Sequence, residues 1–190
     1  SSRTSQIMVE VVNIVASGHL GRELDLRALQ NDLDAYEKIY EPERFPGLQL
    51  RFEEGSTVLI LYSTGSYSIM GAKSEEELGN IYISLSEAVG DLGIEITDKG
   101  KRPEVRNLIC KADLRREFDL SALSVGLGLE NTEYEPEQSP FLFYWPEEHD
   151  CLITIPTNGA VSITGVETVE EAEQGFIHIQ NRIEELCQQE

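Results

Sequence analysis

The sequence predicts an α+β protein built from two tandem copies of one unit, and the main evidence is self-similarity at a fixed offset. YEPERFPGL, which begins at Tyr40, returns as YEPEQSPFL at Tyr134 with six of nine residues identical. NIVASGHLGRELDLRAL, which begins at Asn13, returns as NLICKADLRREFDLSAL at Asn107 with eight of 17 identical. Both pairs are 94 residues apart, and one shared offset is the signature of a repeat.

A third match has the same spacing and fixes the expected boundaries. Gly71 of GAKSEEE is followed 94 residues later by Gly165 of GVETVEE. Three matches without a gap indicate a tandem duplication. We expect a first repeat at residues 8–94, a linker at 95–102 and a second repeat at 103–187.

Each repeat should begin with a strand and a short helix. IMVEVVNIVA is rich in β-branched residues, which favour strands. ELDLRALQNDLDAY follows, with leucines at close to helical spacing. Proline and glycine turns then divide the chain into three or four short strands. One of these, TVLILYS, is continuously apolar and should be buried on one side.

Each repeat should end with a long amphipathic helix. Ser74 with Glu77, and Thr168 with Glu171, have the capping-box spacing of a helix start. Apolar stripes at helical spacing follow in both repeats: Leu78, Ile81, Leu85, Val89 and Leu92, then Ala172, Phe176, Ile179, Ile183 and Leu186. Two such units can join their sheets edge to edge with both long helices on one face. The other face of the curved antiparallel sheet is then uncovered, and an apolar uncovered face needs a partner.

Charge is the unusual feature of the composition. Thirty-five acidic residues against 15 Lys and Arg give a net charge of −20. Such a surface repels nucleic acid at low salt and keeps a protein soluble at high salt. At molar salt the screening length falls to about 3 Å, so the self-repulsion would largely vanish. We interpret the acidity as adaptation to a salt-filled cytosol; the alternative is a generic acidic protein.

The reactive side chains do not form a recognisable catalytic or metal-binding pattern. Three scattered cysteines favour a reducing compartment without a disulfide framework. His19, His149 and His178 are expected to be isolated surface or boundary residues. The sequence contains no glycine-rich phosphate loop, no nucleophile–base pairing and no apolar run of 18 residues. We therefore expect no enzyme activity, no cofactor or metal, and no membrane span.

The repeated motifs resemble those of the TATA-box-binding protein family. The residues that carry the resemblance are NIVAS, ELDL, YEPERFPGL, the glycine turn before SIMGAKSEEE and their second-repeat counterparts, which cover nearly the whole chain. With the acidity, the sequence is most similar to the archaeal branch from salt-loving organisms. The resemblance implies a saddle-shaped sheet with both long helices on its convex face. It also implies a cytosolic, nucleoid-associated initiation factor whose concave face binds the minor groove of AT-rich promoter DNA.

The resemblance implies a marked difference between the two repeats at the ends of the DNA site. Family members wedge one aromatic pair per repeat between base steps. The first pair falls on Phe45 and Tyr62, whereas the second falls on Ser139 and Pro156, which are not wedges. The family's basic phosphate-contacting positions remain basic in the first repeat and are lost in the second. The retained basic residues of the first repeat are Arg51 and Lys73, and Trp145 and Glu167 stand at the equivalent positions of the second repeat.

The centre of the implied DNA site is better preserved. Asn13 and Asn107 match family asparagines that hydrogen-bond the minor-groove acceptors of A·T pairs. The other matched central positions are aliphatic or small, and at some of them this sequence departs from the family's residue. The DNA-binding set implied by the resemblance is Asn13, Val15, Phe45, Arg51, Tyr62, Ser68, Met70, Lys73, Asn107, Ile109 and Thr164.

The implied protein partners are transcription factor B and a second copy of the chain. In the family the second-repeat YEPE turn binds factor B through acidic residues, and Glu135 and Glu137 match them. The bland alternative is a solvated acidic turn. An unbound saddle in this family often pairs its concave face with that of a second copy, so a homodimer is also expected.

Two functional hypotheses follow from these matches. One is a general initiation factor that binds AT-rich promoter DNA and recruits factor B. The other is a divergent paralogue that binds factor B, or itself, without productive DNA binding. Three second-repeat residues favour the second hypothesis: Ser139, Pro156 and Trp145. The residues that favour the first hypothesis are Asn13, Phe45, Arg51, Lys73 and Asn107. From Glu117 onward, 16 acidic residues against one base also indicate that the second repeat contributes little to DNA affinity. Without the resemblance, a curved-sheet ligand-binding fold with a clear pocket beneath its helices would be the alternative.

Overall fold

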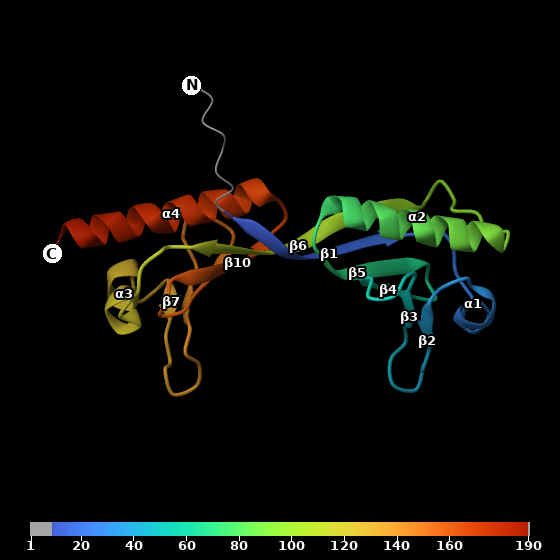
Figure 1. The fold of residues 1–190 in the computed structure, drawn as a ribbon, viewed down its shortest axis with the longest axis horizontal. Helices are drawn as coiled ribbons and strands as arrows, with labels where there is room; N and C mark the ends of the chain where they lie inside the picture. The colour runs from blue at the N-terminus through green and yellow to red at the C-terminus, as the bar shows by residue number, and fades with distance from the viewer. Residues whose placement is uncertain (1–8, 190) are drawn as a thin grey trace, which may run out of the picture. The chain divides into compact units, whose positions relative to one another are not determined.

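The computed structural model describes residues 9–189 and contains, over those residues, four helices and ten strands (Figure 1). It divides into two compact units, residues 13–106 and residues 9–12 with 107–189. We call them the first-repeat unit and the second-repeat unit. These limits differ from the repeat limits because β1 (Glu10–His19) and β6 (Lys101–Asp113) each run through both units. The assignment of repeats to 8–94 and 103–187 stays a prediction.

The first-repeat unit is an antiparallel sheet with two helices. After β1 come α1 (Leu26–Asp32), β2 (Glu37–Ile39), β3 (Leu48–Arg51), β4 (Val58–Leu61), β5 (Ser66–Ala72) and α2 (Glu75–Asp91). The strand order is β2-β3-β4-β5-β1. The predicted short helix, several short strands and long helix are thus confirmed.

The second-repeat unit has the same elements in the same order. After β6 come α3 (Leu120–Leu127), β7 (Thr132–Glu133), β8 (Leu142–Tyr144), β9 (Leu152–Ile155), β10 (Ala160–Val166) and α4 (Val169–Gln188). The strand order is β7-β8-β9-β10-β6. The predicted α+β class is confirmed, and the internal similarity of the sequence is also an internal similarity of structure.

Both long helices begin at the predicted caps. The Ser74 hydroxyl accepts a hydrogen bond from the Glu77 backbone N–H at 3.1 Å, and Thr168 accepts the equivalent bond from Glu171 at 3.1 Å. Most of the predicted stripe of each helix is buried, but Leu92 is an exception with 39% of its surface exposed. Leu92 lies one residue beyond the end of α2, so its side chain no longer follows the helix face that packs on the sheet.

Within each unit, the long helix covers one face of the sheet and leaves the other face to solvent. In Figure 1, α2 runs along the strands of the first-repeat unit and α4 along those of the second. In β4, Leu59 and Leu61 are fully buried while Val58 and Ile60 are half-exposed, as expected for TVLILYS. This alternation recurs along the strands because successive side chains point to opposite faces. We call the uncovered side of each unit its open face.

Candidate nucleic-acid interface

The open face of the first-repeat unit brings together three of the predicted central residues. Val15 of β1 pairs with Met70 of β5, and Ser68 of β5 pairs with Ile60 of β4. Directly paired residues of antiparallel strands share a face. Met70 is 51% exposed, so an apolar, uncharged strip is available to a partner.

The open face of the second-repeat unit repeats this arrangement. Thr164 of β10 pairs with Leu152, and Ser162 pairs with Thr154. Ile109 alternates on β6 with the buried Leu108 and Cys110, and is half-exposed. The centre of this face therefore also consists of aliphatic side chains and short hydroxyls.

The two matched asparagines differ in their hydrogen bonding. Asn107 Oδ1 accepts a hydrogen bond from the Gly165 backbone N–H at 2.9 Å. This bond directs the N–H donors of the Asn107 amide away from Gly165. Asn13 lies beside the equivalent Gly71, but its Oδ1 atom is buried without a hydrogen-bond partner among the described residues. The two asparagines therefore contribute differently to the free energy of folding, because a buried acceptor without a partner, such as Asn13 Oδ1, costs about 1–3 kcal/mol.

The first predicted aromatic pair is assembled in the structure. The rings of Phe45 and Tyr62 meet edge to face with centroids 6.2 Å apart. Gly47 allows this, since a Cβ there would lie 2.9 Å from the Phe45 ring and 3.2 Å from the Tyr62 ring. Both rings are half-exposed, so they lie together at the surface of the unit.

The equivalent positions of the second-repeat unit are held in turns and have no ring pair. The Ser139 hydroxyl accepts a hydrogen bond from the Phe141 backbone N–H at 3.2 Å, and the Pro156 carbonyl accepts one from Gly159 at 3.2 Å. Phe141 itself is 39% exposed and occupies the place of Gly47 in the repeat. Phe141 was not among the residues predicted from sequence, although the change from PGL to PFL between the two copies of the motif could have identified it.

The two predicted phosphate-contacting bases have different surroundings. Arg51 Nε lies 3.0 Å from the Glu37 carboxylate, and its guanidinium also donates to the Ser56 carbonyl. Lys73 is exposed, and its backbone N–H donates to Glu77 at 2.8 Å. Arg51 is therefore held in place with part of its charge compensated.

Trp145 takes the place of Arg51 in the second-repeat unit and contacts a second aromatic ring. Trp145 is 43% exposed, and its ring lies tilted against Phe143 with centroids 6.4 Å apart. Its backbone N–H donates to the Asn131 carbonyl at 2.9 Å, so the position keeps its place beside the neighbouring strand. The unit has lost this positive charge without losing the local backbone arrangement.

The two YEPE turns share a backbone and differ in charge. The Glu135 carbonyl accepts hydrogen bonds from Gln138 and Ser139 at 2.9 and 3.0 Å, as the Glu41 carbonyl does from its own turn. In the first turn, Arg44 lies 3.5 Å from the Glu41 carboxylate. Gln138 takes that place in the second turn, so exposed Glu135 and Glu137 have no such neutralising arginine within the turn.

The histidines are not all isolated, which corrects the expectation from sequence. His178 Nε2 lies 2.7 Å from the Tyr144 hydroxyl, and the His149 ring lies 5.1 Å from the His178 ring. Burial, followed by the positive charge that His149 can carry, lowers the pKa of His178. These residues come from separate elements of the second-repeat unit, so their spacing in the chain gave no signal.

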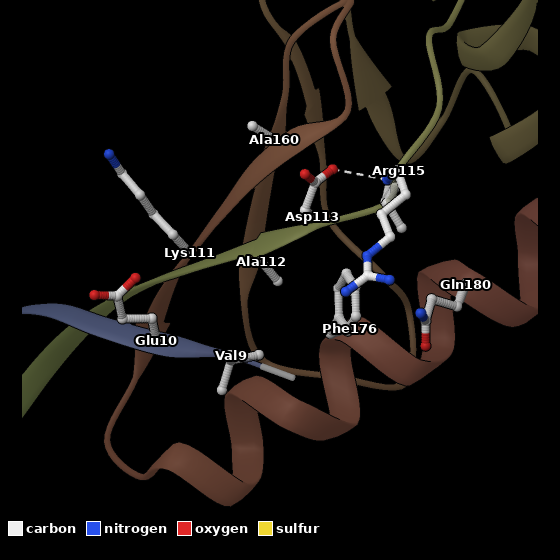
Figure 2. A pocket seen from close by; sticks show the side chains of 10 residues that line it. Val9, Glu10, Lys111, Ala112, Asp113, Arg115, Ala160, Phe176 and Gln180 are labelled. Atoms are coloured by element: carbon white, nitrogen blue, oxygen red, sulfur yellow. Dashed lines mark hydrogen bonds between the residues drawn. The ribbon is translucent and has the colours of Figure 1, made fainter. Parts of the chain in front are cut away.

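A hollow of about 730 Å³ in the second-repeat unit does not have the character of a catalytic site. Figure 2 shows the Arg115 side chain extending over Phe176 and Gln180 of α4, with the Arg115 backbone N–H bonded to Asp113 at 2.7 Å. Glu10 and Lys111 complete a lining of mixed charge. Over residues 9–189, no three His, Cys, Asp or Glu side chains are grouped to hold a metal ion. None of the helices there combines the length and apolar character needed to cross a membrane.

Comparison with known proteins gives a consistent set of matches. The family model described as "Transcription factor TFIID (or TATA-binding protein, TBP)" matches residues 8–87 and 102–186. The chain is 40% identical over 178 residues to TATA-box-binding protein C of Halobacterium salinarum, covering 94% of this chain and 98% of that protein. It is 35% identical to the TATA-box-binding protein of Natronomonas pharaonis, with 94% of each chain covered. The solved structure of Methanococcus jannaschii TBP matches with a TM-score of 0.81 and 32% identity, over 93% of this chain and 98% of that chain.

Proposed function

The chain belongs to the TATA-binding protein family of transcription factors, and from this premise we propose that it binds AT-rich promoter DNA in the minor groove and recruits transcription factor B. It is an archaeal, halophile-type member by its relatives, and the family consists of transcription factors, not enzymes. The residue roles that follow are part of the proposal.

The observation that carries the proposal is the orientation of Asn107. Its Oδ1 atom accepts a hydrogen bond from the Gly165 backbone N–H, so the side-chain Nδ2–H donors remain available to a ligand. The floor of the minor groove at A·T pairs offers only acceptors, adenine N3 and thymine O2. The neighbouring Ile109 and Thr164 add apolar and small contacts, which suit base edges and sugars. In the first-repeat unit Asn13, Val15, Ser68 and Met70 take the corresponding roles.

The first-repeat unit supplies most of the remaining DNA contacts in this proposal. Phe45 and Tyr62 already form a surface pair that can enter an unstacked base step, replacing lost stacking worth a few kcal/mol. Arg51 and Lys73 neutralise phosphates, and each such contact adds salt-dependent affinity. Trp145 and Glu167 add no positive charge in the second-repeat unit, so binding should be asymmetric.

Recruitment of factor B is assigned to the second YEPE turn. Glu135 and Glu137 are exposed on a turn held by two backbone hydrogen bonds. The second turn has no equivalent of Arg44, so the negative charge of these two carboxylates suits a partner with a basic surface. Hydrogen bonds to charged groups contribute about 1.5–3 kcal/mol each, so the pair is enough to define a contact.

A second candidate function is favoured by the acidity of the second-repeat unit. From Glu117 onward, 16 acidic residues face one base, Arg182. A chain of this kind would bind factor B, or pair its open faces with those of a second copy, without productive DNA binding. Either activity would place the protein with the transcription machinery at the nucleoid.

One titration distinguishes the candidates. An AT-rich duplex and a GC-rich control of equal length are titrated in molar KCl, each with and without factor B. Preference for the AT-rich duplex, strengthened by factor B, supports the proposal. Binding of factor B with no DNA binding at any salt concentration would replace it with the second candidate, and sedimentation of the free chain would then show whether it self-associates.

A further inference from the structure

The first-repeat unit contains a concentration of positive charge that the proposed function does not use. A pocket of about 430 Å³ is lined by three cations, Lys99, Lys101 and Arg106. Among its described lining residues none is Asp or Glu, in a chain whose net charge is −20. The lining also includes Ser17, Ser66 and Ser68, and Ser68 belongs to the proposed DNA-contacting set as well. We call this site the basic pocket.

The segment that carries the two lysines is tied to the sheet. The Tyr67 hydroxyl donates to the Lys101 carbonyl at 2.9 Å, and the Thr97 hydroxyl donates to the Gly21 carbonyl at 2.9 Å. Gly18 is required for this approach, since a Cβ there would lie 2.5 Å from the Lys101 carbonyl oxygen and 2.2 Å from the Tyr67 hydroxyl. The lysines therefore extend from a fixed backbone, which lowers the entropy cost of bringing them to one ligand.

Two other polar side chains of the pocket have hydrogen bonds that leave donors free. The Gly21 backbone N–H donates to His19 Nδ1 at 2.7 Å. A neutral imidazole whose Nδ1 accepts must carry its proton on Nε2, so His19 offers a donor. Arg106 Nε donates to the Ser17 hydroxyl at 2.7 Å, which orients the guanidinium beside the pocket.

The carboxylate that pairs with Arg106 compensates little of this charge. Arg106 lies 3.4 Å from Glu104, and their side chains are 54% and 59% exposed. Exposed pairs of this kind contribute at most about 1 kcal/mol and are screened by salt. A ligand with several anionic oxygens can replace Glu104 at the guanidinium, because arginine binds such groups through two parallel hydrogen bonds.

We propose that the basic pocket binds a phosphate group. Three cations and a set of N–H and O–H donors match an anion with several acceptor oxygens and more than one negative charge. The phosphate can belong to a DNA strand or to free phosphate. The proposal goes beyond the proposed function, since free phosphate would bind in the absence of DNA.

The test compares two variants with equal loss of charge. In the first, Lys99, Lys101 and Arg106 are all changed to Gln, which removes the cations of the pocket. Three lost charges take the net charge from −20 to −23. Circular dichroism in molar KCl establishes that the variant retains its fold.

The control variant loses three charges elsewhere in the same unit, by changing Arg22, Arg27 and Arg44 to Gln. None of these residues lines the basic pocket. The control also reaches −23, so general electrostatic effects and the salting-out effect of phosphate on stability are matched.

The free-phosphate arm uses inorganic phosphate and amide chemical shifts, at constant ionic strength and at the lowest KCl concentration that preserves the fold. Amides at residues 17–19, 66–68 and 99–101 should shift and saturate in the unmodified chain and the control, but not in the pocket variant. The DNA arm measures log Kd against log salt concentration for the AT-rich duplex. One lost phosphate contact should reduce the slope by about 0.9 relative to the control.

A difference between pocket variant and control in either arm supports the proposal, and the arm that responds identifies the source of the phosphate. Equal behaviour of the two variants in both arms would overturn it. If the unmodified chain binds no DNA but its amide chemical shifts still respond to inorganic phosphate, the proposed function is wrong and the phosphate-binding proposal is supported.

Discussion

The two equivalent asparagines should respond differently to truncation. Asn107→Ala removes the 2.9 Å hydrogen bond from Gly165, and a bond of this kind contributes about 0.5–1.5 kcal/mol. Asn13→Ala removes a buried acceptor that has no partner among the described residues, so the loss should be near zero or reversed. We expect the variants to differ by about 1–2 kcal/mol in free energy of unfolding.

Thermal unfolding in molar KCl measures this difference. For a chain of this size about 1 kcal/mol shifts the Tm by roughly 2–4 °C, so Asn107→Ala should melt several degrees below Asn13→Ala. An equal fall in Tm for both variants, or a larger fall for Asn13→Ala, would refute the reasoning from hydrogen bonding.

A third variant separates stability from DNA recognition. Asn107→Asp keeps an oxygen to accept the bond from Gly165 but has no N–H donor for the minor groove. It should melt close to the unmodified chain and lose about 1–3 kcal/mol of binding to the AT-rich duplex, which is roughly 5–150-fold in Kd. Unchanged affinity would remove Asn107 from the DNA contact.

The remaining predictions concern salt, the acidic turn and DNA bending. Because the net charge is −20, the Tm should rise as KCl increases to the molar range, and a flat or falling curve would contradict the halophile interpretation. Glu137→Lys should weaken the complex with factor B about tenfold or more in a pull-down titration, whereas the matched Glu43→Lys in the first turn should not; equal effects would make both turns plain solvated loops. DNA bound to the unmodified chain should be bent less than DNA kinked at both ends of the site, and Phe45→Ala should reduce the bend further. End-to-end energy transfer measures both bend angles, and a full two-ended bend with the unmodified chain would contradict this prediction. Phe141→Ala should leave the bend unchanged, and a loss of bend there would assign the second wedge to this displaced ring.

Local patterns were enough to predict the elements of each repeat. β-branched runs, glycine and proline turns and the capping pairs Ser74–Glu77 and Thr168–Glu171 act within a few residues, so the sequence already contains the interactions that form them. The aromatic pair of Phe45 and Tyr62 was also predictable, because the repeat offset and the family resemblance located both positions.

Contacts between distant segments could only be known from the tertiary structure. Asn13 and Asn107 are the same residue at the same place in the repeat, and the strands beside them have equivalent register, with Ile14 opposite Ala72 and Leu108 opposite Val166. Only Asn107 nevertheless accepts a hydrogen bond from its glycine, a difference that the repeated sequence does not reveal. The histidine and tyrosine cluster joins residues that are tens of positions apart. The basic pocket likewise combines β1, the start of β5 and the segment from Lys99 to Arg106. The sequence by itself determined the fold class, the repeat and the net charge. Which charged groups and donors lie together was decided by the tertiary structure, because their positions depend on strand register and on the close approach of the Lys101 backbone that Gly18 permits.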